Sequence, residues 1–95
     1  MKNKRGINEK PDLNEVVKTE KDKFRFLVLH NDDFNTFDYV IETLIEVCEH
    51  NLVQAEQCTF IVHYKGKCDV KRGSYEKLSP IKRELIVRGL SATID

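Results

Sequence analysis

The chain has 95 residues, with 16 basic and 16 acidic side chains and a net charge of zero. This length suits one small domain, and the balanced charge argues against a nucleic-acid-binding protein, which carries a basic surface. No apolar run approaches the roughly 20 residues that span a bilayer. The charged start of the chain also leads into no apolar block of a secretory signal, so we expect a cytoplasmic protein that does not bind membranes.

The first segment, residues 1–23, is predicted to be a flexible N-terminal tail. It holds 12 charged residues and few large apolar ones, and Pro11 interrupts it. Such a segment buries too little surface to offset the loss of chain entropy on folding. The tail is either inert or held by a partner, and its composition does not separate these options. The compact domain is then expected over residues 24–95.

The domain begins with an apolar, aromatic run over residues 24–30, which is typical of a buried strand. A helix is predicted from about Thr36 to Glu49, because the apolar residues there follow helical spacing. Asn35 fits the N-cap of this helix, and Asp38 then falls at the third helical position, where an acid is favourable.

Three polar residues at the strand-to-helix corner, Asn31, Asp32 and Asp33, have no part in that helix cap. A helix N-terminus attracts anions, but this corner carries its own acids and should attract a cation or an amine instead. A solvated turn is the alternative, since Asn and Asp are common turn residues.

A second helix is expected from Asn51, which fits its N-cap, to Gly66, which fits its left-handed C-terminal position. Its last turns carry no charged residue when His63 is neutral. One face packs on the core, while the face with Thr59, Val62 and His63 needs a second cover, either a loop or a ligand. His63 itself is either a satisfied core residue or an acceptor for a donor ligand.

The remaining chain predicts a strand over 67–72, a short third helix over 81–88 and a last strand over 90–94. Ser79 and Pro80 fit the N-cap and first position of that third helix. The predicted fold is α+β: a small open α/β sandwich of order β-α-α-β-α-β, in which three helices cover a three-stranded antiparallel sheet.

Signatures of metal and catalytic sites are weak. The corner matches a calcium loop in part, but Thr36 stands where that loop needs glycine. The three cysteines have no zinc-type spacing, and we interpret them as structural thiols. No phosphate loop or nucleophile motif occurs, so we predict no metal, no cofactor and no catalytic residue, and a protein that is not an enzyme.

Two stretches of the chain together resemble the ClpS family, the adaptors of bacterial Clp proteases. The first is a strand entering Asn31-Asp32-Asp33-Phe34 and followed by Phe37-Asp38-Tyr39-Val40, and the second is Val62-His63-Tyr64-Lys65-Gly66-Lys67. The resemblance is good over residues 24–73 and looser beyond.

The resemblance implies an adaptor that binds substrates through a free, bulky, hydrophobic N-terminal residue and delivers them to an AAA+ unfoldase, ClpA-like or ClpC-like. It implies that Asn31, Asp32 and His63 hold the α-amino group of a substrate beginning with Leu, Phe, Tyr or Trp. Asp33 and Asn35 would shape the corner and meet the substrate backbone. The first side chain would enter an apolar pocket that maps to Phe37, Val40, Thr59, Val62 and Leu90.

The chain departs from the family pattern at several positions. The family usually has Thr-Pro where Asn35 and Thr36 stand, and Met where Phe37 and Thr59 stand. The third helix is predicted to be about six residues shorter than usual. An alternative interpretation is a protein-binding module of similar fold, ribosomal-stalk-like or unfoldase-inhibiting, in which the corner is only a turn.

Overall fold

The computed structural model describes residues 24–95 of the protein. The predicted flexible tail, residues 1–23, lies outside the described residues. The elements follow in the order β1 (Arg25–His30), α2 (Phe37–Cys48), α3 (Leu52–Lys65), β2 (Lys67–Gly73), α4 (Tyr75–Val87) and β3 (Ser91–Ile94). This confirms the predicted β-α-α-β-α-β order.

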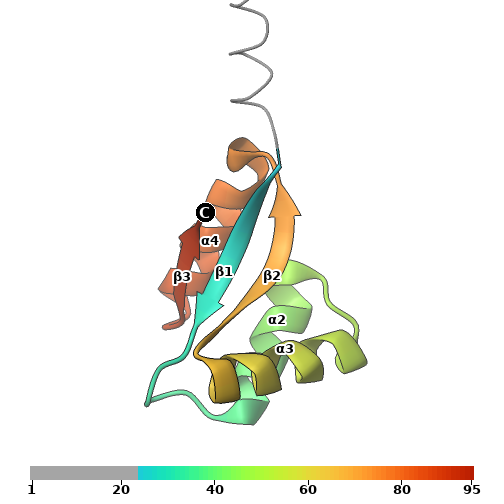
Figure 1. Ribbon diagram of the computed structural model, residues 1–95, viewed down its shortest axis with the longest axis vertical. Coiled ribbons are helices and arrows are strands. Elements are labelled where there is room, and N and C mark those ends of the chain that lie inside the picture. The colour runs from blue at the N-terminus through green and yellow to red at the C-terminus, as the bar shows by residue number, and fades with distance from the viewer. Residues whose placement is uncertain (1–23) are drawn as a thin grey trace, which may run out of the picture.

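The three strands form one antiparallel sheet in the order β2-β1-β3, so the first strand lies in the middle. The sheet faces the viewer in Figure 1, with α4 behind it and α3 across its lower end. Leu27 and Leu29 of β1 are fully buried and meet Leu44 of α2, Leu78 and Leu85 of α4 in one core. The predicted open sandwich is therefore confirmed.

The N-cap of helix α2 lies one residue later in the chain than predicted. Thr36 is the N-cap, and its hydroxyl accepts the backbone N–H of Tyr39 at 3.1 Å. The prediction of Asn35 as the cap was wrong, and Asp38 accordingly lies at the second helical position. The Asn35 side chain is engaged elsewhere, as described below. The caps predicted for α3 are confirmed, since Asn51 accepts from Gln54 N and Gly66 has a positive φ of 94°.

The third helix is longer than predicted. Ser74 caps α4 by accepting the backbone N–H of Lys77, and Pro80 lies inside the helix instead of at its start. Leu78, Ile81 and Leu85 share one helical face and pack into the core, so burial on both sides of Pro80 carries the helix through it. The prediction of a short helix starting after Ser79 was wrong for this reason.

Candidate functional site

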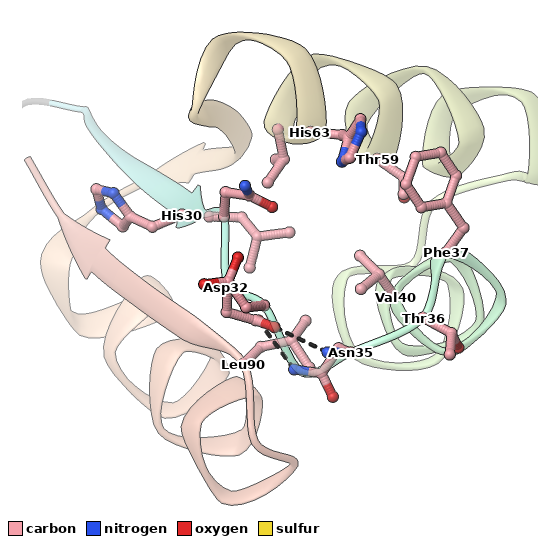
Figure 2. A pocket seen from close by; sticks show the side chains of 13 residues that line it. His30, Asp32, Asn35, Thr36, Phe37, Val40, Thr59, His63 and Leu90 are labelled. Carbon is pink, nitrogen blue, oxygen red and sulfur yellow. Dashed lines mark hydrogen bonds between the residues drawn. The ribbon is translucent and has the colours of Figure 1, made fainter.

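A cavity of about 350 Å³ lies where β1 ends, between the corner, α2, the last turns of α3 and the residue before β3. Figure 2 shows it with the 13 side chains that line it. All ten residues singled out from the sequence are among them: Asn31, Asp32, Asp33, Asn35, Phe37, Val40, Thr59, Val62, His63 and Leu90. The structure therefore brings the corner and the apolar face of α3 together, while the role of each residue stays a prediction.

The end of α3 is joined to the corner through the backbone. The Asn31 N–H donates to the Gly66 carbonyl at 2.9 Å, and the Gly66 N–H donates to the Val62 carbonyl at 2.9 Å. The positive φ of Gly66 ends the helix and turns its carbonyl outward to β1. This local geometry places His63, one helical turn before Gly66, beside the acidic corner.

The Asp32 carboxylate organises the corner. One oxygen accepts the backbone N–H groups of Phe34 and Asn35, both at 2.8 Å, and the other accepts the Asn35 side-chain amide at 2.9 Å. Burial raises the pKa of Asp32, but the hydrogen bonds from Asn35 and Phe34 outweigh burial and bring the pKa below its ordinary value. Asp32 is therefore ionised at neutral pH, and a carboxylate with about four lone-pair sites keeps capacity for one more donor.

Asn35 connects this corner to the turn between α4 and β3. Its side-chain amide donates to Asp32 and also to the Gly89 carbonyl at 3.0 Å. Gly89 precedes Leu90, which lines the cavity. Asn35 thus fixes Asp32 relative to the part of the cavity wall that Leu90 forms, which we name the Leu90 wall. Because the Asn35 side chain is engaged in these contacts, Thr36 serves as the helix cap.

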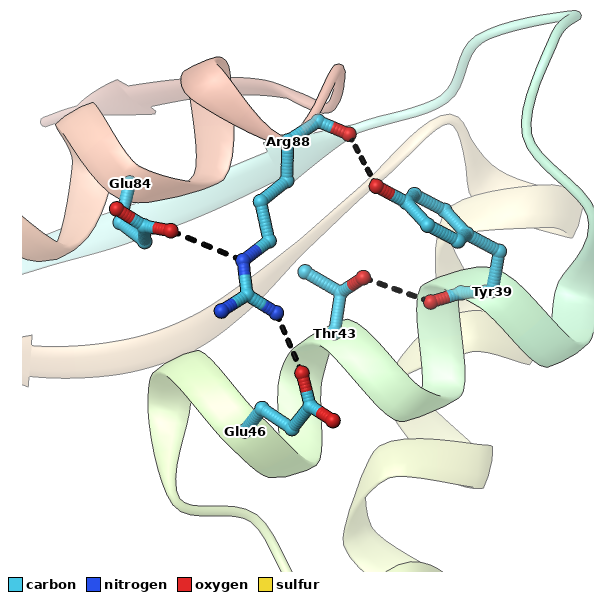
Figure 3. A network of polar contacts seen from close by, with 5 residues as sticks. All are labelled: Tyr39, Thr43, Glu46, Glu84 and Arg88. Atoms are coloured by element: carbon cyan, nitrogen blue, oxygen red, sulfur yellow. Dashed lines mark hydrogen bonds and ion pairs between the residues drawn. The ribbon is translucent and has the colours of Figure 1, made fainter.

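A second connection between α2 and the same turn runs through Tyr39 and Arg88. Figure 3 shows the Tyr39 hydroxyl donating to the Arg88 carbonyl at 2.6 Å. The Arg88 guanidinium lies between Glu84, 2.9 Å from its Nε, and Glu46 of α2. The pair of Glu84 and Arg88 is the i, i+4 pair expected on a helix. These contacts fix the position of the Leu90 wall relative to α2.

Several polar side chains of the cavity keep unused hydrogen-bonding capacity. Within residues 24–95, no hydrogen bond involves the side chains of Asn31, Asp33 or His63. All three are exposed to solvent. Figure 2 shows His63 and Asp32 on the cavity, with Asp32 across from Phe37. Amide, carboxylate and imidazole acceptors therefore converge on a space that a cationic donor can enter.

The rest of the cavity wall is apolar. Leu29, Val62 and Leu90 are buried, and they belong to the core. The Thr59 hydroxyl donates to the Ala55 carbonyl at 2.7 Å, so its hydrogen is satisfied within α3. Phe37 packs edge-on against His63, with ring centroids 5.0 Å apart. This wall suits an uncharged side chain.

Three lining residues were missed by sequence reasoning: Leu29, His30 and Thr36. Leu29 and His30 belong to the strand predicted before the corner, and the end of a strand that leads into a site is a place to look for lining residues. His30 Nε2 lies 2.7 Å from the Thr93 hydroxyl of β3, so its ring is held by the sheet. The only sequence feature that could have indicated Thr36 as a lining residue is its position between Asn35 and Phe37.

No group of three or more His, Cys, Asp and Glu side chains is placed to hold a metal ion within residues 24–95. A search of the same residues finds no helix with the length and apolar character needed to cross a membrane.

The fold and the cavity define a small α+β domain whose cavity combines polar acceptors with an apolar wall. A family model described as the ATP-dependent Clp protease adaptor protein ClpS matches residues 19–92. The chain belongs to the ClpS family. Because the family is one of protease adaptors, membership agrees with the prediction that the chain is not an enzyme.

Curated relatives carry the name ATP-dependent Clp protease adapter protein ClpS. The protein of Clostridium acetobutylicum is 45% identical over 55 residues, which cover 58% of this chain and 54% of the relative. The protein of Acetivibrio thermocellus is 39% identical over 51 residues, covering 54% of this chain and 52% of the relative. The chain thus spans about half the length of the curated relatives it matches.

A solved structure supports the fold independently. Agrobacterium tumefaciens ClpS2 bound to L-phenylalaninamide superposes with a TM-score of 0.67 at 19% identity, covering 78% of this chain and 96% of that one. At this identity the likeness shows a shared fold.

Proposed function

We propose that the chain is an adaptor that binds proteins through a free N-terminus with a bulky apolar first residue and delivers them to an AAA+ Clp unfoldase. The observation that carries the proposal is the convergence of Asn31, Asp32 and His63 on one cavity whose remaining wall is apolar. The relative from Agrobacterium tumefaciens supports it, because L-phenylalaninamide joins a free α-amino group to an aromatic side chain.

The chemistry of a chain end matches the polar part of the cavity. An α-amino group has a pKa of about 7.7–8.0, so it is mostly protonated at neutral pH and offers three donors. The Asp32 carboxylate supplies a charge-assisted acceptor, and Asn31 and His63 supply neutral ones. An acetylated end loses the charge and most of the donors. Each acceptor that a bound segment buries without giving it a partner costs about 1–3 kcal/mol, which disfavours internal peptide segments.

The first side chain adds affinity through the apolar wall. Burying a Leu or Phe side chain stabilises a complex by about 1.5–3 kcal/mol. A cavity of about 350 Å³ is small for a ligand site, which suits one residue and not a longer segment. Leu, Phe, Tyr and Trp are the proposed first residues, with Phe37 and Thr59 setting the choice among them.

The ClpA-like or ClpC-like class of the unfoldase and a cytoplasmic location belong to the same proposal. The described thiols of Cys48, Cys58 and Cys68 are free, as is usual in a reducing compartment. Copurification with a ClpA-like and a ClpC-like unfoldase, each with and without a bound peptide, separates the two classes.

The central experiment is a calorimetric titration with peptides that begin with Leu, Phe, Tyr or Trp, each free and acetylated. We expect at least a tenfold preference for the free form, which corresponds to about 1.4 kcal/mol. His63→Ala and Asp33→Asn should weaken binding, whereas Asp38→Asn, which changes an exposed acid outside the cavity lining, should not. Equal affinity for free and acetylated peptides would refute the proposal and favour a module without a site for chain ends.

A further inference from the structure

Four aromatic rings from α2 and α3 contact one another at the edge of the cavity. Phe37 packs edge-on against Phe60, with centroids 5.4 Å apart, and against His63 at 5.0 Å. Tyr64 closes the set, edge-on to His63 at 4.9 Å and stacked on Phe60 at 6.2 Å. We name Phe37, Phe60, His63 and Tyr64 the aromatic ridge.

The aromatic ridge is continuous with the cavity and extends beyond it. Phe37 and His63 line the cavity, whereas Phe60 and Tyr64 are not part of its lining. Phe60 is 49% exposed and Tyr64 is 75% exposed. Exposed aromatic rings that adjoin a ligand cavity indicate an interaction surface and not a packing contact of the folded chain.

We propose that the aromatic ridge binds the second and third residues of the substrate and favours aromatic or long aliphatic side chains there. This inference rests on the proposed function, because it starts from a chain end in the cavity. The Asp32 carboxylate lies across the cavity from Phe37 (Figure 2), and His63, which packs against Phe37, lies on the side of the cavity where the aromatic ridge begins. A chain whose amine is held between Asp32 and His63 can therefore continue over the aromatic ridge.

The dimensions of an extended peptide agree with this path. Two residues of extended chain span about 7 Å. Phe60 and Tyr64 lie one ring beyond Phe37 and His63, at centroid separations of 5.4 and 4.9 Å. Two residues of extended chain are therefore longer than the separation between the inner rings, Phe37 and His63, and the outer rings, Phe60 and Tyr64. Their flat, rigid faces lose little side-chain entropy on binding, which makes them effective contacts.

The experiment compares three ligands: leucinamide, a peptide beginning Leu-Gly-Gly and a peptide beginning Leu-Phe-Gly. Phe60→Ala and Tyr64→Ala are the test variants. Tyr75→Ala is the matched control, because Tyr75 is 50% exposed, like Phe60, but starts α4 and lies outside the cavity lining. Each protein is titrated with each ligand, and its thermal midpoint is recorded.

We expect the unmodified chain to bind the Leu-Phe-Gly peptide about 3–10-fold more tightly than the Leu-Gly-Gly peptide. The two test variants should lose this ratio and keep their affinity for leucinamide, which has no second residue. Tyr75→Ala should keep the ratio. If Phe60→Ala lowers the thermal midpoint, Phe60→Leu keeps the apolar volume without the ring and should still reduce the ratio.

Unchanged ratios in Phe60→Ala and Tyr64→Ala would overturn the inference while leaving the proposed function intact, provided that leucinamide binds. Failure of leucinamide to bind the unmodified chain would instead refute the proposed function. Sedimentation of the same variants tests a different occupant, a second copy of the chain. A dimer that the two substitutions convert to a monomer, with peptide ratios unchanged, would also overturn the inference.

Discussion

Replacing Asn35 by alanine tests the connection between the acidic corner and the Leu90 wall. The substitution removes two hydrogen bonds, from the side-chain amide to Asp32 at 2.9 Å and to the Gly89 carbonyl at 3.0 Å. The backbone hydrogen bond from Asn35 to Asp32 remains. A hydrogen bond to a charged acceptor contributes about 1.5–3 kcal/mol and a neutral one about 0.5–1.5 kcal/mol.

The expected loss lies below the sum of these two values. Asn35 is only partly buried, and water replaces part of each lost contact. We expect Asn35→Ala to lower the free energy of unfolding by about 1–2 kcal/mol. With a urea slope of about 1 kcal/mol per molar for a small domain, the unfolding midpoint should fall by about 1–2 M. Far-UV circular dichroism across a urea series measures this change.

Asn31→Ala is the matched control for Asn35→Ala. The Asn31 side chain lines the cavity but forms no hydrogen bond within residues 24–95, so its loss should change stability by less than about 0.5 kcal/mol. It should, however, weaken binding of a free peptide. In a double-mutant cycle, Asp32→Ala and Asn35→Ala should be less than additive, because they remove one shared contact. An unchanged midpoint in Asn35→Ala, or an equal loss in Asn31→Ala, would refute the assigned role of Asn35.

Three further predictions concern the backbone, the pH response and the thiols. Gly66→Ala should lower the free energy of unfolding by about 1–2 kcal/mol in a urea titration, because φ is 94° at this position. The added carbon has no atom within 4 Å, so the cost comes from the backbone and not from a clash. Gly73→Ala, whose added carbon makes ordinary contacts at 3.9 Å, is the control, and equal costs would contradict the reasoning. Peptide binding should weaken as pH rises through about 8, where the substrate amine loses its proton. The pKa of Asp32 is lowered in the folded chain. Its contribution to stability is therefore complete above the unfolded value of about 3.9 and is lost as pH falls through the folded value. The stability difference between the unmodified chain and Asp32→Asn should accordingly shrink below about pH 4, and a constant difference would contradict this. Burial raises the pKa of Cys48 to about 11. Burial together with contact with Cys58 raises the pKa of Cys68 to about 12. Alkylation of either thiol by iodoacetamide at pH 8, followed by mass spectrometry, should therefore be at least about 100-fold slower than in the urea-unfolded chain, whereas similar rates would show that these thiols are accessible.

Local patterns predicted most of the fold. The order of the elements, the Asn51 cap and the Gly66 stop depend on nearby residues, so the sequence alone indicates them. The two errors had other origins. Asn35 is a good cap residue, but its amide is used by Gly89, which is 54 residues away. Ser79 and Pro80 have the chemistry of a helix start, but Ser74 caps the helix earlier and burial of Leu78 favours the extra turn.

For the candidate site, most of the lining residues could be predicted from the sequence, but the contacts between them could not. The family resemblance selected residues that lie around one cavity, although the residues alone left the corner open between a turn and a binding site. No sequence pattern reports that Asn35 bridges Asp32 and Gly89, or that the Phe37 ring packs on His63. Both features depend on elements far apart in the chain, and only the folded arrangement brings them together.

The inner wall of the cavity is also part of the hydrophobic core. Leu29, Val62 and Leu90 are each less than a tenth exposed and contact the other core residues. Trimming any of them to admit a larger first residue would withdraw apolar contacts from the fold itself, at a cost of about 2–5 kcal/mol for a leucine-to-alanine change. A substitution at these positions that admits more kinds of first residue therefore lowers the stability of the fold. Evolutionary change of the preferred first residue is expected to act through Phe37, which lines the cavity, is only partly buried and lies outside the core cluster.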